Sequence, residues 1–207
     1  IPAPRPNERD LAFAEAQKVL HSFGITAVAD MGTSIEDWQA FRRAGDTGAL
    51  TLRIMAYAAG PDQMELIAGA RPSPWLYDDK LRLNGVKIYL DGALGSRGAW
   101  LKRPYADDPG NTGLPLTGPA KLRNILVRAA QGNFQPAIHA IGTAANEDAL
   151  NAIAELAESF PGDRRWRIEH AQIVDPGDLP KFGQHGIIAS MQPGPYTHLT
   201  LPTNRKG

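Results

Sequence analysis

The sequence predicts an α/β fold, a partial TIM-type (β/α)8 barrel, and three observations lead to it. Short apolar runs that read as buried strands alternate with helical segments, which is the pattern of a parallel sheet. No G-x-G-x-x-G fingerprint follows a strand, and the glycines at 92, 95 and 98 are spaced differently, so a dinucleotide fold is disfavoured. Six strands are expected where a closed barrel has eight, so we expect the remaining strands beyond one or both ends.

The first half of the chain contains three expected helices. Apolar residues at 12, 16, 19, 20 and 23 recur at helical spacing and predict a helix from Asn7 to Phe23, which Gly24 ends. The other elements expected here are a strand at 25–31, a helix from about 34 to 44 that Gly45 ends, a strand at 50–58, a short helix at 61–68, and a strand that begins near 86 after a polar stretch.

The second half opens with a long segment, 92–118, that is rich in Gly, Pro, Asp and Asn. Loops of that length in a compact domain are usually functional. The elements expected after it are a helix at 119–131, a strand at about 137, a helix at 146–160 with one apolar face, a strand at 167, a short helix at 175–184 and a strand at 186–191.

Composition narrows the classes of function. The 207 residues carry 22 Lys+Arg and 22 Asp+Glu without a basic block, which argues against a nucleic-acid partner. The apolar stretches are too short to span a membrane. We therefore expect a small-molecule partner, while the oligomeric state stays open and the compartment could be cytoplasm or periplasm. Because the chain has no cysteine, any metal site must use His, Asp, Glu or a modified Lys.

Lys87 lies within an apolar run, Val86 to Leu90. Alternation along a strand places Lys87 on the face that points into the barrel, where an unpaired ammonium is costly. A salt bridge to a carboxylate such as Asp91, a Schiff base with a carbonyl substrate, or carbamylation to an anionic metal ligand would each relieve that cost.

Two histidines occupy similar apolar runs on the next strands. His139 lies between Ile138 and Ala140, and His170 follows Glu169. A lone histidine in such a strand is more often a hydrogen-bonded core residue than a ligand. On three consecutive strands, however, Lys87, His139 and His170 should converge at the carboxyl ends of a barrel, where the catalytic groups of this fold lie. Imidazole and carboxylate-type ligands suit zinc and similar divalent ions.

These runs are parts of longer blocks, and with them the sequence resembles the amidohydrolase superfamily, specifically its amidohydrolase family 3 branch. The resemblance extends from about residue 10 to 192. Its blocks are GITAVAD at 24–30, NGVKIYLDGALGSR at 84–97, YADDPGNTG at 105–113, IHAIG at 138–142 and RIEHAQ at 167–172.

The resemblance implies a metal-dependent hydrolase of carbon–nitrogen bonds other than peptide bonds, acting through attack of a metal-bound water. It implies that Lys87, carboxylated, and His139 and His170 bind one or two divalent ions, with zinc the expected metal. The family's His-x-His pair from the first strand and aspartate from the last strand have no counterpart here, so the catalytic residue is unknown. The chain would then supply strands two to seven.

The resemblance also concerns the loop at 92–118, which would form one wall of the substrate pocket. Arg97 and Tyr105 are candidates for contact with substrate, and stabilisation of the loop alone is the other interpretation. The family often reads His-Ala-Ile-Gly-Asp where Thr143 replaces the aspartate, so a substrate-orienting role at Thr143 is in doubt.

We expect residues 1–194 to form the incomplete barrel domain and 195–207 a non-native tail. The run from Tyr196 to Thr203 resembles the translation of a sequencing adaptor, and a genuine polar tail is the alternative. Because such a barrel lacks its first and last strands, we expect the isolated polypeptide to be poorly stable and inactive. Two other functions remain open: a Schiff-base lyase or aldolase that uses Lys87 as nucleophile, and a non-catalytic binding barrel.

Overall fold

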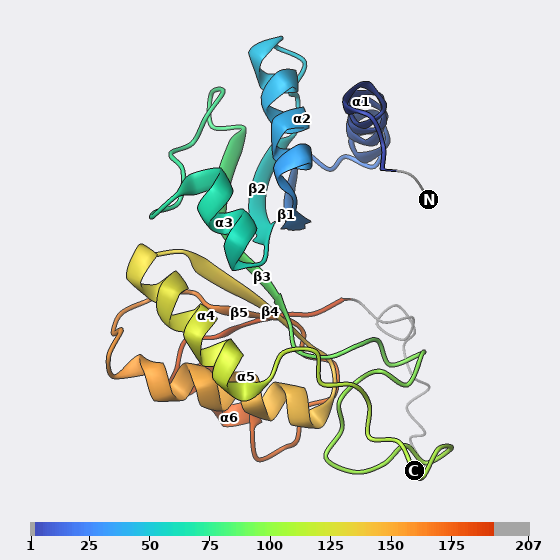
Figure 1. The fold of residues 1–207 in the computed structure, drawn as a ribbon, viewed down its shortest axis with the longest axis vertical. Coiled ribbons are helices and arrows are strands. Elements are labelled where there is room, and N and C mark those ends of the chain that lie inside the picture. Colours follow the sequence, from blue (N-terminus) through green and yellow to red (C-terminus); the bar gives the residue numbers. More distant parts are fainter. Residues whose placement is uncertain (1–2, 193–207) are drawn as a thin grey trace, which may run out of the picture.

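The computed structural model describes residues 3–192 and contains one parallel sheet of six strands in sequential order (Figure 1). The strands are β1 (Ala27–Thr33), β2 (Arg53–Ala59), β3 (Leu81–Tyr89), β4 (Gln135–Ala140), β5 (Arg167–His170) and β6 (Ile188–Ser190). The sheet curls into a half-barrel, which confirms the predicted partial TIM-type fold.

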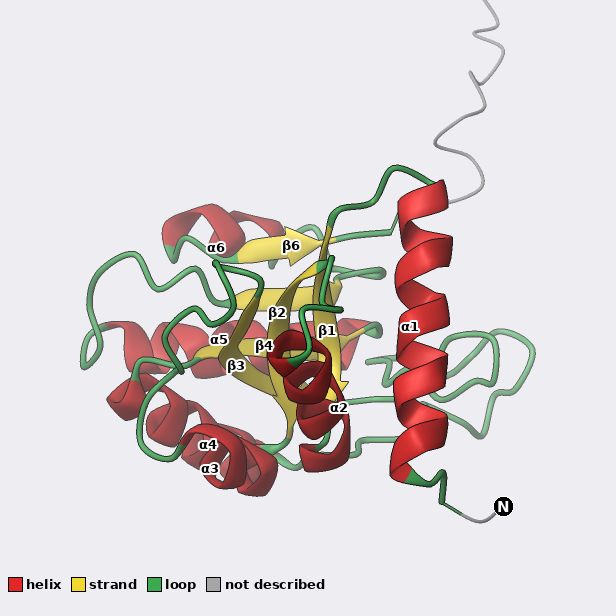
Figure 2. Ribbon diagram, turned by 90° about the horizontal axis from the view of Figure 1, so that it is seen from above, coloured by secondary structure: helices red, strands yellow, loops and turns green. Residues whose placement is uncertain are grey.

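Helices connect the strands and cover the outer face of the sheet (Figure 2). They are α1 (Pro6–Ser22), α2 (Ile35–Asp46), α3 (Pro61–Ala68), α4 (Pro119–Gly132), α5 (Thr143–Ala157) and α6 (Leu179–Gln184). The one long connection without helix or strand runs from β3 to α4, as the loop at 92–118 predicts. No helix within residues 3–192 combines the length and apolar character needed to cross a membrane.

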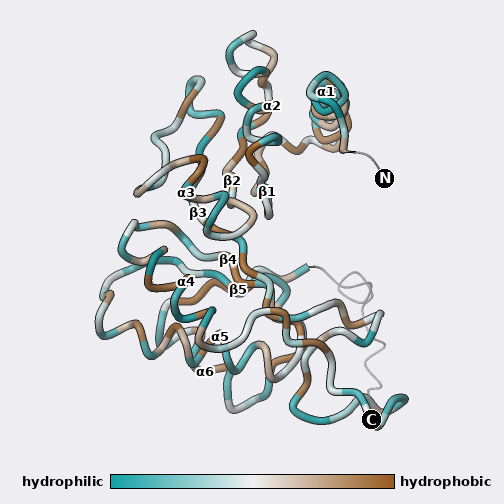
Figure 3. Tube along the Cα trace, in the orientation of Figure 1, coloured by the Kyte–Doolittle hydropathy of each residue, from teal (hydrophilic) through white to brown (hydrophobic). Residues whose placement is uncertain are grey.

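The core lies between the sheet and its helices. Strand residues such as Ile54, Val86, Ile138 and Ile168 pack there against helix residues such as Leu126, and each of the four strand residues is at most 1% exposed. In Figure 3 hydrophobic stretches occur in the strands, while the helices alternate between hydrophobic and hydrophilic colour, as expected of helices with one buried face. The face of the strands that carries Lys87 is therefore the inner face of the half-barrel.

The strand register determines which residues of neighbouring strands lie side by side on that inner face. Tyr89 pairs with His139, His139 with Glu169, and Glu169 with Ser190. One level lower, Lys87 pairs with Ala137. The carboxyl ends of β3, β4 and β5 thus bring polar side chains from three neighbouring strands into one place.

Several predicted boundaries are wrong for local reasons. Gly45 does not end α2: an added Cβ there would come within 2.5 Å of the Tyr77 ring, so this glycine permits close packing, and Thr47 caps the helix through its hydroxyl. β3 begins at Leu81 rather than near 86, because Leu81 and Leu83 are buried in the core and already pair with β2. α5 begins at Thr143 and not at 146.

The predicted apolar face of α1 is also wrong. Phe23 is 77% exposed and Val19 is 49% exposed, whereas Gln17 is the buried residue of this helix. The Gln17 side chain accepts a hydrogen bond from Thr51 N (2.8 Å) and donates one to Ala49 O (3.2 Å). The face of α1 that carries Gln17 is therefore buried, because its amide binds backbone groups in the segment before β2. The predicted tail at 195–207 lies outside the described residues and stays a prediction.

Candidate metal centre

The structure brings the three predicted ligands, Lys87, His139 and His170, to one end of the sheet. The His139 and His170 rings lie 4.5 Å apart, edge to face. The Tyr89 ring bridges the group, with its centroid 5.6 Å from that of His139 and 5.0 Å from Lys87 Nζ. The three residues therefore form one cluster, and their role as ligands stays a prediction.

Lys87 is 4% exposed, and among the described residues it forms no salt bridge, so the salt bridge to Asp91, one of the three alternatives for this lysine, is absent. Burial is the main cause that lowers the pKa of Lys87 from 10.5 to about 8; the Glu169 carboxylate opposes this shift and the Arg167 guanidinium adds to it. Glu169 is itself held by Arg167 Nε at 2.5 Å. The lysine is thus enclosed without a direct counter-ion.

His139 is similarly enclosed. Burial, followed by the neighbouring His170 and Lys87, lowers its pKa, so the neutral imidazole that can bind a metal is favoured. Its Nε2 atom is buried and has no hydrogen-bond partner within the described part of the chain. Asp91 Oδ1 lies 3.4 Å from that nitrogen, without hydrogen-bond geometry.

His170 reaches the cluster through an unusual backbone. Alternation along β5 would place it with Ile168, on the face that packs against the helices. Instead His170 has φ +76° and Ala171 has φ +42°, so the chain turns at the end of the strand and the ring swings towards His139. His170 Nδ1 lies 2.8 Å from Gln192 Oε1, which leaves Nε2 for a ligand. Left-handed backbone at non-glycine residues is often found at functional sites.

The donor set fits a divalent ion only if the lysine takes part. No group of three or more His, Cys, Asp or Glu side chains within residues 3–192 is arranged to hold a metal. Two imidazoles and a buried lysine remain. A lysine carbamate would supply the oxygen ligand that the cluster otherwise lacks.

Sequence reasoning gave Tyr89 no role in this site and named Asp91 only as a possible salt-bridge partner of Lys87. Tyr89, 45% exposed, forms the ring wall between Lys87 and His139, and its place on the strand of Lys87 could have indicated this. Asp91 is 1% exposed and accepts hydrogen bonds from three backbone amides. The sequence does not indicate that Asp91 accepts hydrogen bonds from the loop and from the segment after β4.

The predicted substrate contacts, Arg97 and Tyr105, both make contacts inside the loop. Arg97 Nη2 forms a salt bridge with Asp107 Oδ2 at 2.6 Å. Tyr105 is 9% exposed and its hydroxyl donates to Ala99 O at 2.9 Å. These contacts agree with a role in shaping the loop, and contact with substrate stays a prediction for both residues.

The loop is fastened to α5 and to the segment before α6 by Lys102. Its Nζ lies 2.9 Å from Glu147, 2.6 Å from Asp175 and 3.2 Å from Asp178, and Asp175 followed by Glu147 raises the pKa of Lys102. The Lys102 backbone N–H donates to Thr143 Oγ1 at 2.9 Å. Thr143, which replaces the family's aspartate, therefore holds the loop.

Replacement of Lys102 by Met should loosen the loop without unfolding the chain. We expect a loss of about 1 kcal/mol in unfolding free energy, because the partly exposed cluster is screened by solvent. Amide hydrogen exchange across 98–118 should accelerate. Arg97→Met, which removes an exposed pair inside the same loop, is the control and should change stability less than Lys102→Met does. Equal effects of the two variants would contradict the assignment of Lys102 as the fastening residue.

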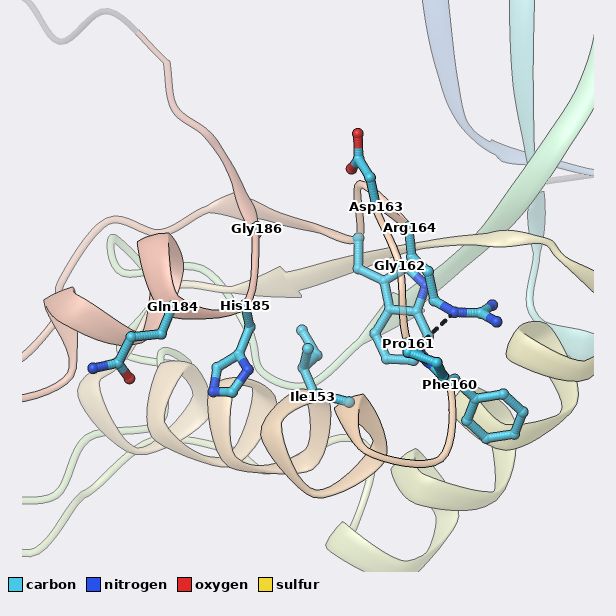
Figure 4. Close-up of a pocket in the computed structure, with 11 residues that line it drawn as sticks. Ile153, Phe160, Pro161, Gly162, Asp163, Arg164, Gln184, His185 and Gly186 are labelled. Carbon is cyan, nitrogen blue, oxygen red and sulfur yellow. Dashed lines mark hydrogen bonds between the residues drawn. The ribbon is translucent and has the colours of Figure 1, made fainter.

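Two cavities differ in their relation to the cluster. One of about 310 Å³ adjoins it: Lys87 and Tyr89 line it together with Leu116 and Thr117 from the end of the loop. The cavity in Figure 4, about 420 Å³, lies at the opposite end of β5, between α5 and α6, and His185 and Ile153 are among the residues that line it. The Arg164 side chain extends away from His185, and its Nε donates to Phe160 O at 2.9 Å. None of the predicted site residues lines this second cavity.

Known proteins resemble this chain in fold and in sequence. An uncharacterized metal-dependent hydrolase from Pyrococcus horikoshii OT3 has a similar structure, with a TM-score of 0.82 and 28% identity over 91% of this chain and 38% of that one. Protein LONG AFTER FAR-RED 3 of Arabidopsis thaliana is 36% identical over 204 residues, 90% of this chain and 34% of that protein. The N-substituted formamide deformylase of Arthrobacter pascens is 24% identical over 203 residues, 90% of this chain and 36% of that protein.

The chain thus spans about a third of the length of these curated relatives. A family model described as Amidohydrolase family (Amidohydro_3) matches residues 2–205. The matched region includes all six strands and the cluster of Lys87, His139 and His170. The chain belongs to the amidohydrolase family 3 branch of the amidohydrolase superfamily.

Proposed function

We propose that this chain is part of a hydrolase that cleaves carbon–nitrogen bonds other than peptide bonds in a small-molecule substrate, with the help of one or two divalent ions. The observation that carries the proposal is the convergence of Lys87, His139 and His170 at the ends of three neighbouring strands. A divalent ion there would polarise a carbonyl group and lower the pKa of a water molecule.

The family resemblance and one relative support the proposed type of bond. The deformylase of Arthrobacter pascens acts on N-substituted formamides according to its name, and these contain a non-peptide carbon–nitrogen bond. The cavity of about 310 Å³ beside Lys87 has room for part of a small substrate, and Tyr89 offers it an exposed aromatic ring. An amide with a compact substituent is the substrate class that we propose.

Lys87 would act as a carbamate. The Lys87 ammonium would first lose a proton, and the neutral amine would then combine with carbon dioxide to form a carbamate and release a second proton. An enclosed cation would thereby become an anion that can bind a metal. Support comes from the burial of Lys87 and from its lack of a salt bridge among the described residues. Zinc is the proposed ion, since two imidazoles and an oxygen anion suit it.

The chain by itself would be a poor catalyst. Its five histidines include no His-x-His pair, and no residue has been assigned to move the proton during hydrolysis. We propose that the cluster binds a metal weakly in this chain and that turnover of an amide needs the further ligands that the family resemblance implies. Zinc-dependent amidase activity of the isolated chain would contradict this part of the proposal.

Metal binding is the direct test. Calorimetric titration of the chain with zinc in bicarbonate buffer should show saturable binding, and His139→Ala should weaken the affinity by at least about tenfold. His21→Ala removes a histidine outside the cluster and is the matched control. Zinc binding that both variants retain would contradict the site. Borohydride trapping of a carbonyl compound on Lys87 would instead favour the Schiff-base alternative.

A further inference from the structure

Asp91 is the most enclosed carboxylate beside the cluster and follows directly after the last residues of the β3 segment. Its Oδ2 accepts the backbone N–H of Trp100 at 2.9 Å and that of Gly142 at 2.8 Å, and its Oδ1 accepts that of Ile141 at 3.0 Å. Trp100 belongs to the long loop, while Ile141 and Gly142 join β4 to α5. One side chain thus connects the ends of two strands with the loop.

The loop is pressed closely against this junction. Trp100 O accepts the N–H of Ala144 at 3.1 Å, in the first turn of α5. A Cβ atom on Gly142 would lie 2.0 Å from the same oxygen, so there is no free space between the two segments. The amides that hold Asp91 therefore have little freedom to move, and neither does its carboxylate.

The same carboxylate faces a proposed metal ligand. Asp91 Oδ1 lies 3.4 Å from His139 Nε2, the buried nitrogen that has no hydrogen-bond partner among residues 3–192. Histidines that bind metals almost always donate their other ring N–H to a carboxylate, a carbonyl or water, and this bond fixes the tautomer and the orientation of the ring. A small rotation of the His139 ring would convert the contact into such a bond.

We infer that Asp91 is a positioning residue: it orients the His139 imidazole through Nε2 and is itself held in place by the amides of Trp100, Ile141 and Gly142. The inference rests on the proposed metal site and adds that the loop at 92–118 contributes to metal affinity. Because coupling between two events is reciprocal, metal binding at His139 should also stabilise the loop at Trp100.

Asp91→Asn tests the inference, because the amide keeps the shape of the carboxylate but replaces one acceptor oxygen with an NH2 group. In the full chain, with zinc alone as the probe, we expect a 10- to 100-fold loss of affinity. Hydrogen exchange of the amides at 98–102 and 139–144 should accelerate. Asp107→Asn, in the same loop but paired only with exposed Arg97, should change neither quantity.

A second variant separates orientation of His139 from general loosening. Lys102→Met combined with Thr143→Val releases the loop at two contacts that do not involve Asp91. It should accelerate exchange in the loop and lower zinc affinity by less than about threefold. If it weakens zinc as much as Asp91→Asn does, Asp91 acts only through the stability of the loop and the inference is wrong.

The unsubstituted chain provides a measurement that does not depend on the folding of any variant. In its zinc complex, nitrogen NMR should show a slowly exchanging proton on His139 Nε2, and zinc should slow exchange at Trp100. A zinc complex without that proton overturns the inference. Failure of the unsubstituted chain to bind zinc overturns the metal site as well, whereas zinc binding that Asp91→Asn retains overturns only the role of Asp91.

Discussion

Gly142→Ala should destabilise the protein by roughly 3 kcal/mol, because it forces a methyl group into a backbone contact. An added Cβ would lie 2.0 Å from Trp100 O, 2.4 Å from Trp100 C and 2.7 Å from Trp100 N. None of these atoms belongs to a flexible side chain that could turn aside. Relief requires the loop and the start of α5 to separate, which also breaks the bonds that hold Asp91.

Gly118→Ala is the matched control for this prediction. Gly118 caps α4 with φ −71° and ψ 159°, and Gly142 caps α5 with φ −78° and ψ 162°. An added Cβ at Gly118 meets nothing within 4 Å. Both variants change an N-cap glycine to alanine. The difference between their unfolding free energies, measured with urea, should therefore report the steric clash at Gly142 alone. Similar unfolding free energies would show that the loop can move away at little cost.

Lys87→Met should make the metal-free protein more stable and abolish zinc binding at the cluster. Burial lowers the Lys87 pKa from 10.5 to about 8, so near pH 7 the folded state carries a disfavoured charge. Each pKa unit corresponds to about 1.4 kcal/mol, and we expect a gain on the order of 2–3 kcal/mol after methionine fills the same space. Loss of function accompanied by a gain in stability would distinguish a site residue from a structural one.

The difference in unfolding free energy between the unsubstituted chain and Lys87→Met should depend on pH in a defined direction. An unfolded lysine keeps its proton up to about pH 10.5, whereas folded Lys87 loses it above about pH 8. Between these values the unfolded state binds more protons, so the unfolding free energy should rise with pH. Lys87→Met should lack this rise, and exposed Lys121→Met should retain it. The measurements need metal-free buffer from which carbon dioxide is excluded. Parallel curves of unfolding free energy against pH for Lys87→Met and the unsubstituted chain would refute the prediction.

The alternation of strands and helices was enough to predict the fold, because apolar periodicity reports burial directly. The α3 helix was predicted at 61–68, the residues that it occupies. Errors arose where tertiary contacts decide. Gln17 is buried because the backbone ahead of β2 needs its amide, and Gly45 continues α2 because Tyr77 needs the space. Neither partner is close in sequence, so local patterns carry no sign of it.

The sequence predicted that Lys87, His139 and His170 lie together, but it did not predict the geometry of the cluster, and their role as metal ligands stays a prediction. Residue type and strand order indicated Lys87, His139 and His170, and the family resemblance assigned them roles. The position of His170 depends on the left-handed backbone at 170 and 171, which alternation does not predict. The loop contacts of Arg97 and Tyr105 depend on how the loop folds back on itself, and its sequence gives only its length and flexibility.

The left-handed backbone at His170 and Ala171 determines whether this cluster can be grafted onto another protein. On a regular strand, the same sequence would direct the His170 imidazole into the helix layer beside Ile168. Side-chain grafting onto a designed barrel would therefore fail unless the two-residue turn is copied as backbone. A glycine in place of Ala171 would make such a turn easier to build, because glycine adopts positive φ without strain.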